Sequence, residues 1–200
     1  MSNIRIFVSH RIDIDSETVD TPVYFPVRCG AVYDEEGNSE IQGDDTGDNI
    51  SKLRMSFCEF TVQYWAWKNV DADYYGLCHY RRYLSFSDKR YKNTVFNMVR
   101  ELKLTPHEKK KYHLDDTKKI EKTVKQYDMI IPVVAKASEM SYNRAEVKTL
   151  REMWESYNGV YFEQGIIDKM FSLIKEYSPE YYNSACEYFS GKYHRAFNCY

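Results

Sequence analysis

Residues 49–86 read NISKLRMSFCEFTVQYWAWKNVDADYYGLCHYRRYLSF, and this stretch decides the fold. In its first half, apolar and aromatic side chains recur at spacings of four, three, four and three. That spacing places side chains on one face of an α-helix. The positions are Leu53, Phe57, Phe60, Tyr64 and Trp67. We therefore predict an amphipathic helix that presents this face to a hydrophobic core.

The second half of the stretch predicts a strand that follows a tight turn. Residues 69–73 (NVDAD) break the helical period, and Asp and Asn favour turns because their side chains hydrogen-bond to nearby backbone. Residues 74–84 are a mostly apolar, aromatic run, in which Gly76 allows another backbone or a ligand to come close. The strand would deliver a polar group to one end of a sheet: His79, Tyr80, Arg81, Arg82 and Tyr83.

This polar strand end has two interpretations. Guanidinium groups match phosphate oxygens, and an imidazole donates or accepts hydrogen bonds near neutral pH, so the group is suited to bind an anion. The alternative is a structural cluster of salt bridges whose arginines extend towards solvent. Residue types alone leave both interpretations open.

Further strands and helices alternate along the chain. Residues 4–9 (IRIFVS) are an apolar run that ends at His10 and Arg11, and residues 127–134 (YDMIIPVV) are a second one. A smaller apolar island at residues 23–27 lies in a polar region, where we expect a loop with at most short strands. This alternation predicts an α/β domain whose irregular polar loops lie on the ligand side of the sheet.

Capping signals and apolar periodicity predict the remaining helices. Thr105-Pro106-His107-Glu108 is a capping box with proline at the first helical position, and Asp116 can cap a helix over residues 117–126. Periodic apolar residues indicate helices within 147–157, 166–174 and 180–189. The two helices between residues 106 and 126 are rich in lysine. A solvated helix face is the favoured interpretation, and contact with anionic lipid headgroups is the alternative.

Composition limits the function classes. The chain has 200 residues, a net charge of −2 and no linker-like segment, which favours one domain and argues against nucleic acid as a partner. Its five cysteines are scattered, odd in number and without a C-x-x-C pair, so neither a zinc site nor a disulfide framework is indicated. Residues 1–10 (MSNIRIFVSH) lack the long apolar region typical of a signal peptide, and no run approaches the ~20 apolar residues of a spanning helix, so neither is expected. We expect a cytoplasmic protein with reduced thiols.

Two acidic motifs resemble ligand or metal sites. Residues 43–49 (GDDTGDN) lie directly before the predicted helix, but their spacing differs from that of a calcium loop, and a solvated turn is the alternative. Asp71-Ala72-Asp73 has the D-x-D form with which nucleotide-sugar transferases hold a metal. It precedes its strand, however, whereas a metal-holding D-x-D follows one, so we interpret it as a turn. No Walker loop, G-x-G-x-x-G, H-E-x-x-H or G-x-S-x-G motif occurs.

Four blocks resemble, in order and spacing, the family known as domain of unknown function 4422. They are GDDTGDNIS (43–51), CEFTVQYWAWKN (58–69), ADYYGLCHYRRYLSF (72–86) and YDMIIP (127–132). Members of this family occur in bacterial capsular and exopolysaccharide biosynthesis and are regarded as glycosyltransferases. The resemblance runs from Ile4 to the last residue. It implies an α/β, GT-A-like single domain over residues 1–200, with a Rossmann-like mixed sheet flanked by helices. Family members generally continue past residues 197–200, so we expect C-terminal elements of the family to be lacking here.

The resemblance also implies an activity. A hexosyl or galactofuranosyl group would pass from a nucleotide-sugar donor, with a UDP-sugar favoured, to a glycan or lipid-linked saccharide acceptor. The reaction would take place in the cytoplasm, at the inner face of the membrane, with peripheral membrane contact. The charge of the leaving diphosphate must be neutralised by a divalent metal or by fixed cations. His79, Arg81 and Arg82 occupy the place where relatives with a D-x-D put carboxylates, so we hypothesise that these residues supply the cations. The alternative function is a catalytically inactive carbohydrate- or nucleotide-binding module.

The candidate site residues combine the strand end with the family blocks. The catalytic candidates are Glu59, His79, Arg81 and Arg82, and Glu59 is alternatively a structural partner for either arginine. The donor-binding candidates are His10, Asp44, Asp45, Asp48, Asn49, Trp67, Tyr80 and Asn198. Trp65 and Trp67 should point to different faces of the helix, so that one packs in the core and the other is available to stack on a ring. No residue is predicted as a metal ligand.

Overall fold

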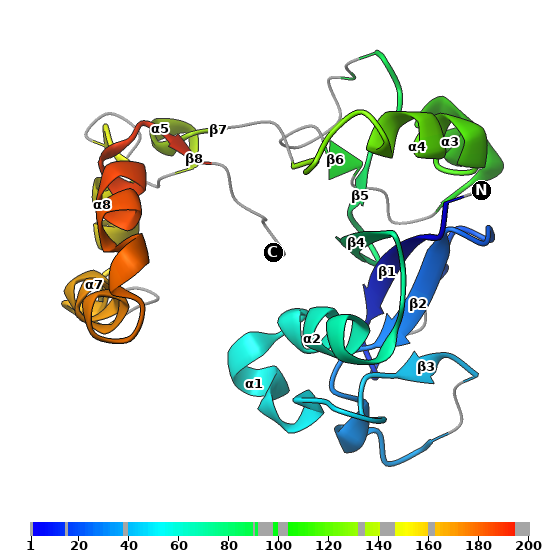
Figure 1. Ribbon diagram of the computed structural model, residues 1–200, viewed down its shortest axis with the longest axis horizontal. Helices are drawn as coiled ribbons and strands as arrows, with labels where there is room; N and C mark the ends of the chain where they lie inside the picture. Colours follow the sequence, from blue (N-terminus) through cyan, green and yellow to red (C-terminus); the bar gives the residue numbers. More distant parts are fainter. Residues whose placement is uncertain are drawn as a thin grey trace. The chain divides into compact units, whose positions relative to one another are not determined.

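The computed structural model describes residues 2–14, 16–37, 40–89, 91, 98–99, 104–131, 135–140, 147–159 and 163–194. They belong to two compact units, one formed by residues 1–130 with 198–200 and the other by residues 131–197. The first unit contains the central sheet, and the second is mainly helical (Figure 1).

A four-stranded parallel sheet forms the centre of the first unit. Its strands are β1 (Ile4–His10), β2 (Tyr24–Arg28), β3 (Gln42–Gly43) and β4 (Tyr74–His79), in the order β3-β2-β1-β4. Because every pairing is parallel, all four carboxyl ends lie at the same edge. The chain runs outward from β1 to β3 and then crosses back to place β4 on the other side of β1. The boundary between β1 and β4 is therefore a topological switch point.

The crossover from β3 to β4 is helical but interrupted. It consists of η2 (Ser51–Leu53), α1 (Arg54–Phe57) and α2 (Phe60–Asn69), with a break at Cys58, whose φ is 47°. The prediction of helix in this stretch is confirmed, although the helix is not continuous.

The prediction of which face of this helix is buried is wrong. Of the stripe residues, Tyr64 is half-buried and the others are exposed: Leu53 47%, Phe57 45%, Phe60 46% and Trp67 65%. The buried residues of α2 are Thr61, Val62, Trp65 and Ala66. Phe60, Tyr64 and Trp67 all lie in α2 and do share one face, but the opposite face, which carries Val62, Trp65 and Ala66, is the one that packs on the sheet. Trp65 packs edge-on against Phe7 of β1.

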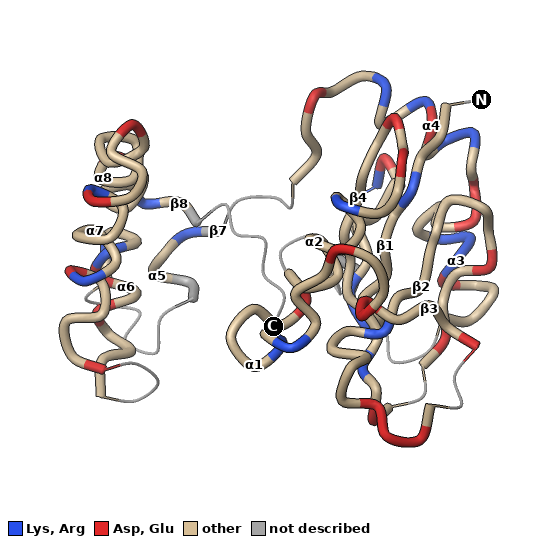
Figure 2. The backbone as a smooth tube through the Cα atoms, turned by 60° about the horizontal axis from the view of Figure 1, so that its bottom comes forward, with Lys and Arg blue, Asp and Glu red and all other residues tan. Residues whose placement is uncertain are grey.

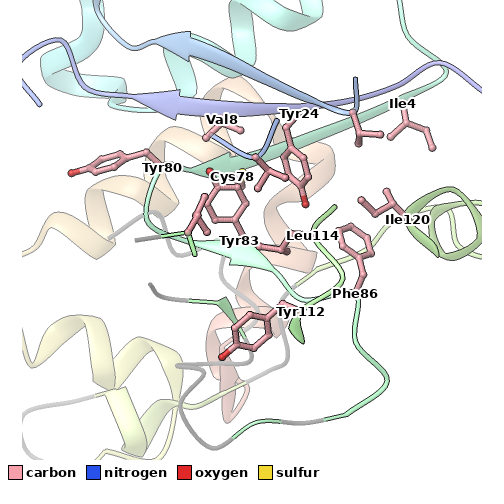
Figure 3. Close-up of a cluster of buried hydrophobic side chains, with 13 residues drawn as sticks. Ile4, Val8, Tyr24, Cys78, Tyr80, Tyr83, Phe86, Tyr112, Leu114 and Ile120 are labelled. Carbon is pink, nitrogen blue, oxygen red and sulfur yellow. The ribbon is translucent and has the colours of Figure 1, made fainter. Parts of the chain in front are cut away.

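The rest of the first unit closes a hydrophobic core on the sheet. After β4, β5 (Tyr83–Leu84) pairs antiparallel with β6 (Met98–Val99), followed by α3 (Pro106–Lys111) and α4 (Thr117–Val124). The Thr105 hydroxyl accepts a hydrogen bond from the Glu108 N–H, and the Asp116 carboxylate accepts one from the Lys119 N–H, so both predicted helix starts are confirmed. Figure 3 shows the core they cover, which includes Val8, Tyr83, Leu114 and Ile120.

The basic residues of α3 and α4 are visible along the backbone in Figure 2. Three of these lysines lie near carboxylates: Lys119 at 2.7 Å from Asp88, Lys125 at 2.7 Å from Glu121 and Lys111 at 3.5 Å from Glu108. These pairs agree with a solvated helix face. Among the described helices, none is both long and apolar enough to cross a bilayer.

The apolar run at residues 127–134 is not a strand in its described part, residues 127–131. Tyr127 and Met129 are 58% and 78% exposed, and residues 132–134 lie outside the described ranges. Apolar composition makes a segment suitable for burial, but a strand forms only where a partner backbone pairs with it. This strand prediction is wrong for residues 127–131.

The second unit is built from α5 (Ala137–Met140), α6 (Leu150–Glu155), α7 (Ile166–Tyr177), η3 (Pro179–Tyr181) and α8 (Tyr182–Ser190). β7 (Ala135–Lys136) pairs antiparallel with β8 (Tyr193–His194). Leu150 and Met153 lie in its core. A complete capping box of Thr149 and Glu152 starts α6. The three helices predicted for this region are confirmed.

Gly30, two residues after the end of β2, gives a testable constraint. Its φ is 70°, and a Cβ there would overlap the side chain of Arg54. Gly30→Ala is expected to lower the free energy of unfolding by about 2–3 kcal/mol, from backbone strain plus overpacking, as measured by urea denaturation. Gly37 is the matched control, because its φ is 61° and no heavy atom of the described residues lies within 4 Å of the position that a Cβ would take there. Gly37→Ala should cost only about 1 kcal/mol. Equal losses of stability in Gly30→Ala and Gly37→Ala would contradict the inference that the Arg54 side chain leaves no room for a Cβ at residue 30.

Candidate functional site

The candidate site lies where β1 and β4 end together. Ser9 of β1 is opposite His79 of β4, and the Tyr80 N–H donates to the Ser9 carbonyl at 3.1 Å. His10 and Arg11 continue from β1 at the same level. This is the topological switch point, where open α/β sheets bind ligands at the carboxyl ends of their strands.

A tight turn folds the chain back after β4. The His79 N–H donates to the Arg82 carbonyl at 3.2 Å, and the Arg82 N–H donates to the His79 carbonyl at 2.8 Å. Arg81 thus lies within the turn, with its guanidinium carbon 4.9 Å from the centroid of the Tyr80 ring. The predicted run 74–84 is therefore two strands joined by a turn. Gly76 does allow a close approach, by the side chain of Ile6 on β1.

His10 is buried and holds the loop after β1. Its Nδ1 lies 2.6 Å from the Ser16 hydroxyl and its Nε2 lies 2.5 Å from the Thr18 hydroxyl. The imidazole also stacks at 6.1 Å on the ring of Tyr80. His10 therefore positions Tyr80 and the loop, and its contact with a donor stays a prediction. Sequence reasoning missed Ser16 and Thr18, because a polar loop gives no periodic signal.

The hydrogen bonding of His79 is that of a neutral imidazole. Its Nδ1 accepts a hydrogen bond from the Arg81 N–H at 3.2 Å, so the ring proton lies on Nε2, 3.4 Å from Oε1 of Glu59. Burial, together with the positive charges of Arg82 and Arg81, lowers the pKa of His79 to about 4. This lowered pKa argues against His79 as a fixed cation in the free protein, while the role of Arg81 and Arg82 as cations stays a prediction.

This lowered pKa makes stability depend on pH. Between about pH 6.5 and pH 4 the unfolded chain binds a proton at His79 that the folded chain does not, so the free energy of unfolding falls as the pH falls through this window. His79→Gln is expected to reduce that loss by about 1–2 kcal/mol, allowing for solvent screening. Urea denaturation at pH 7 and pH 4.5 measures the difference.

His113 provides the control for this pH dependence. It also lies 3.4 Å from a carboxylate, that of Asp116, but at the start of α4 and well exposed. His113→Asn removes this pair and should leave unchanged the part of the loss that depends on His79. If His79→Gln loses as much stability between pH 7 and pH 4.5 as the wild type, the inference that His79 is buried and neutral is contradicted.

Glu59 lies in the break between α1 and α2 and is largely buried. Among the described contacts its carboxylate faces His79, and pairing with Arg81 or Arg82 is not among them. Glu59 therefore faces the histidine, and its predicted roles, in catalysis or as a partner of an arginine, stay predictions.

Asp44 is fully buried at the end of β3. Its Oδ1 accepts hydrogen bonds from the Ala31 N–H at 2.9 Å and the Ser51 hydroxyl at 2.5 Å. Its Oδ2 accepts from the Gly30 N–H at 2.9 Å and the Thr61 hydroxyl at 2.6 Å. Asp44 therefore joins the loop after β2 to the helical crossover. The solvated-turn interpretation is wrong for this residue, and a contact with the donor stays a prediction.

The rest of the acidic loop is open to solvent. Asp45 and Asp48 are exposed, and Asn49 is half-buried. The Tyr64 hydroxyl donates to the Asp48 carboxylate at 3.1 Å, and the Asn69 side chain donates to the Asp48 carbonyl at 2.8 Å. The loop is thus attached to α2 while its carboxylates face outward. Their binding to a donor stays a prediction.

The predicted separation of the two tryptophans is confirmed. Trp65 is buried, whereas Trp67 is exposed with Lys68 Nζ 3.7 Å from its ring centroid. Asn198, another donor-binding candidate, lies outside the described residues.

The predicted site residues form two groups at one edge of the sheet. The acidic loop follows β3 and the His79 turn follows β4, so three strand spacings, roughly 14 Å, separate the two strands. The segment from Glu59 to Tyr64 contacts both groups, through His79, Asp44 and Asp48. No sequence pattern predicted this connection.

Asp71-Ala72-Asp73 lies at the opposite edge. The Asp73 carboxylate accepts a hydrogen bond from the Asn3 N–H at 2.8 Å, before β1 and β4 begin, which confirms the turn interpretation. In the described part of the chain, no three His, Cys, Asp or Glu side chains are grouped so as to hold a metal ion.

Comparisons with known proteins agree with this architecture. No curated protein sequence matches the chain significantly. A solved structure, that of the WbbM bifunctional glycosyltransferase in its apo form, matches with a TM-score of 0.81 and 26% identity, over 98% of this chain and 33% of that one. This chain thus spans about a third of that protein, and the match confirms the predicted GT-A-like α/β fold class. The model of the family described as Domain of unknown function (DUF4422) matches residues 5–200. The chain therefore belongs to the DUF4422 family.

Proposed function

We propose that this chain is a glycosyltransferase domain that binds the diphosphate of a nucleotide-sugar donor at the ends of β1 and β4. The observation that carries the proposal is the structural match to a bifunctional glycosyltransferase over nearly the whole chain. Membership of the DUF4422 family, whose sequence blocks contain the acidic loop and the His79 turn, supports it.

The chemistry of the strand ends suits a diphosphate. Arg81 and Arg82 lie in or beside the turn after β4, and Arg11 follows β1. The two strand ends that they follow lie side by side, because Ser9 of β1 is opposite His79 of β4. When the bond from the sugar to the diphosphate breaks, negative charge develops on the leaving group, and guanidinium groups held there stabilise it. The acceptor hydroxyl forms the new bond and loses its proton.

The finer features of the activity follow from the family resemblance. The donor is a UDP-sugar carrying a hexosyl or galactofuranosyl group, and the acceptor is a glycan or a lipid-linked saccharide. The reaction serves capsular or exopolysaccharide biosynthesis, in the cytoplasm and at the inner face of the membrane.

Isothermal titration of the chain with a panel of UDP-sugars, with and without manganese, tests the proposal. Binding is expected, and its dependence on manganese decides whether a divalent metal takes part. Absence of nucleotide binding under both conditions would contradict the proposal. An assay of glycosyl transfer to lipid-linked saccharides then separates the enzyme from the inactive binding module, which would bind a donor without transferring its sugar.

A further inference from the structure

Glu59 and His79 face each other at the candidate site, with 3.4 Å between the imidazole Nε2 and a carboxylate oxygen. Nδ1 of the same ring accepts a hydrogen bond from the Arg81 N–H, which leaves the proton of the neutral imidazole on Nε2. We propose that binding of a diphosphate at the ends of β1 and β4 is coupled to uptake of one proton by His79, and that Glu59 is the positioning residue that stabilises the protonated imidazole. This inference rests on the proposed function, because the diphosphate is that of the donor.

The charges around His79 come from three elements. The turn after β4 contributes Arg81 and Arg82, and the end of β1 contributes His10 and Arg11. Arg11 is itself paired with Asp13. The break between α1 and α2 contributes Glu59. Burial and the arginines oppose protonation of the imidazole in the free protein. A carboxylate 3.4 Å away favours the protonated form on general electrostatic grounds.

A bound diphosphate reverses this balance. Its negative charges would lie near the guanidinium groups and offset their effect on His79, while the attraction of Glu59 remains. The face of the Tyr80 ring, with its centroid 4.2 Å from that of His79, further favours a cation at this position. The imidazole is therefore expected to take up a proton from solvent as the anion binds.

Proton uptake would also change the hydrogen bonding of the turn. Because Nε2 already carries a proton, the second proton binds at Nδ1, which then donates where it previously accepted. The Arg81 N–H loses its acceptor, which lay 3.2 Å away in the neutral form. Two N–H donors at the turn then become available to an anionic oxygen, and such charge-assisted bonds are among the strongest in proteins.

Titration calorimetry in buffers of different ionisation enthalpy counts the protons bound with the ligand. UDP-galactose is the probe, because its doubly esterified diphosphate has no group that titrates near neutral pH. We expect uptake of about 0.5–0.9 proton per molecule bound at pH 6 and below about 0.1 at pH 8, with binding about fivefold tighter at pH 6. Binding by the wild type without uptake at pH 6 overturns the inference and leaves the proposed function intact.

Substitutions identify which residue takes up the proton. His79→Gln, whose amide can still donate to Glu59 and accept from Arg81, should bind with no uptake and with equal affinity at both pH values. Glu59→Gln should lower uptake at pH 6 to less than about half, and Glu59→Asp should largely restore it. His113→Asn removes the comparable His113–Asp116 pair on α4 and should retain full uptake. Uptake that persists in His79→Gln overturns the inference. Failure of both UDP-galactose and UDP to bind at either pH overturns the proposed function and this inference with it.

Discussion

Replacing Asp44 with alanine is expected to lower the free energy of unfolding by about 3–5 kcal/mol. The carboxylate is fully buried and accepts four hydrogen bonds, from the N–H groups of Gly30 and Ala31 and from the hydroxyls of Ser51 and Thr61. Its removal leaves the two N–H groups and the Ser51 hydroxyl without this acceptor, whereas the Thr61 hydroxyl can still donate to the Cys58 carbonyl at 3.0 Å. A buried donor without an acceptor costs more than the bond itself contributes. Urea denaturation at pH 7 measures the loss.

The neighbouring Asp45 is the control, because its side chain is exposed. Asp45→Ala should change stability by less than about 0.5 kcal/mol. The loss of stability in Asp44→Asn should lie between those of Asp44→Ala and Asp45→Ala. The amide keeps one oxygen acceptor but presents an NH₂ group to the remaining donors. A loss below about 1 kcal/mol in Asp44→Ala would contradict the role of Asp44 as the buried connection between β3 and the helical crossover.

Replacing Arg81 and Arg82 together with alanine is expected to weaken UDP binding by at least about 100-fold. Each charge-assisted contact between a guanidinium and a phosphate contributes about 1.5–3 kcal/mol, and about 1.4 kcal/mol corresponds to a factor of ten in affinity. Isothermal titration of the double variant and of the wild-type chain, both with and without manganese, measures the change.

Two further variants make this test specific. Arg81→Lys combined with Arg82→Lys keeps the charge but loses the planar fork, so an intermediate loss is expected, and it gives a second readout if the alanine variant does not fold. Arg5→Ala removes a guanidinium from the opposite half of β1, where it donates to the Pro22 carbonyl, and should bind UDP like the wild type. Metal-dependent binding that survives loss of both Arg81 and Arg82 would show that a metal, and not these cations, holds the diphosphate.

Local signals in the sequence predicted much of the fold. The apolar runs that became β1 and β4, the turn at residues 71–73, and the helix starts at Thr105 and Asp116 all depend on neighbours within a few positions. The parallel order of the strands then explains why His10 and His79 meet at one edge. The strand predicted at residues 127–134 failed in its described part because apolar composition does not supply a pairing partner.

By itself the sequence determined the class of the fold, the family, and the placement of His79, Arg81 and Arg82 at the end of a strand. Only the tertiary structure decided which face of α2 is buried, what Asp44 binds, and the charge of His79. The face of α2 that carries Val62 and Trp65 packs on the sheet, and the donors to Asp44 come from positions 7 to 17 residues away. The lowered pKa of His79 comes from burial and from charges in the turn after β4 and at the end of β1. These properties depend on how distant segments pack together, which periodicity and capping signals in a single segment do not encode.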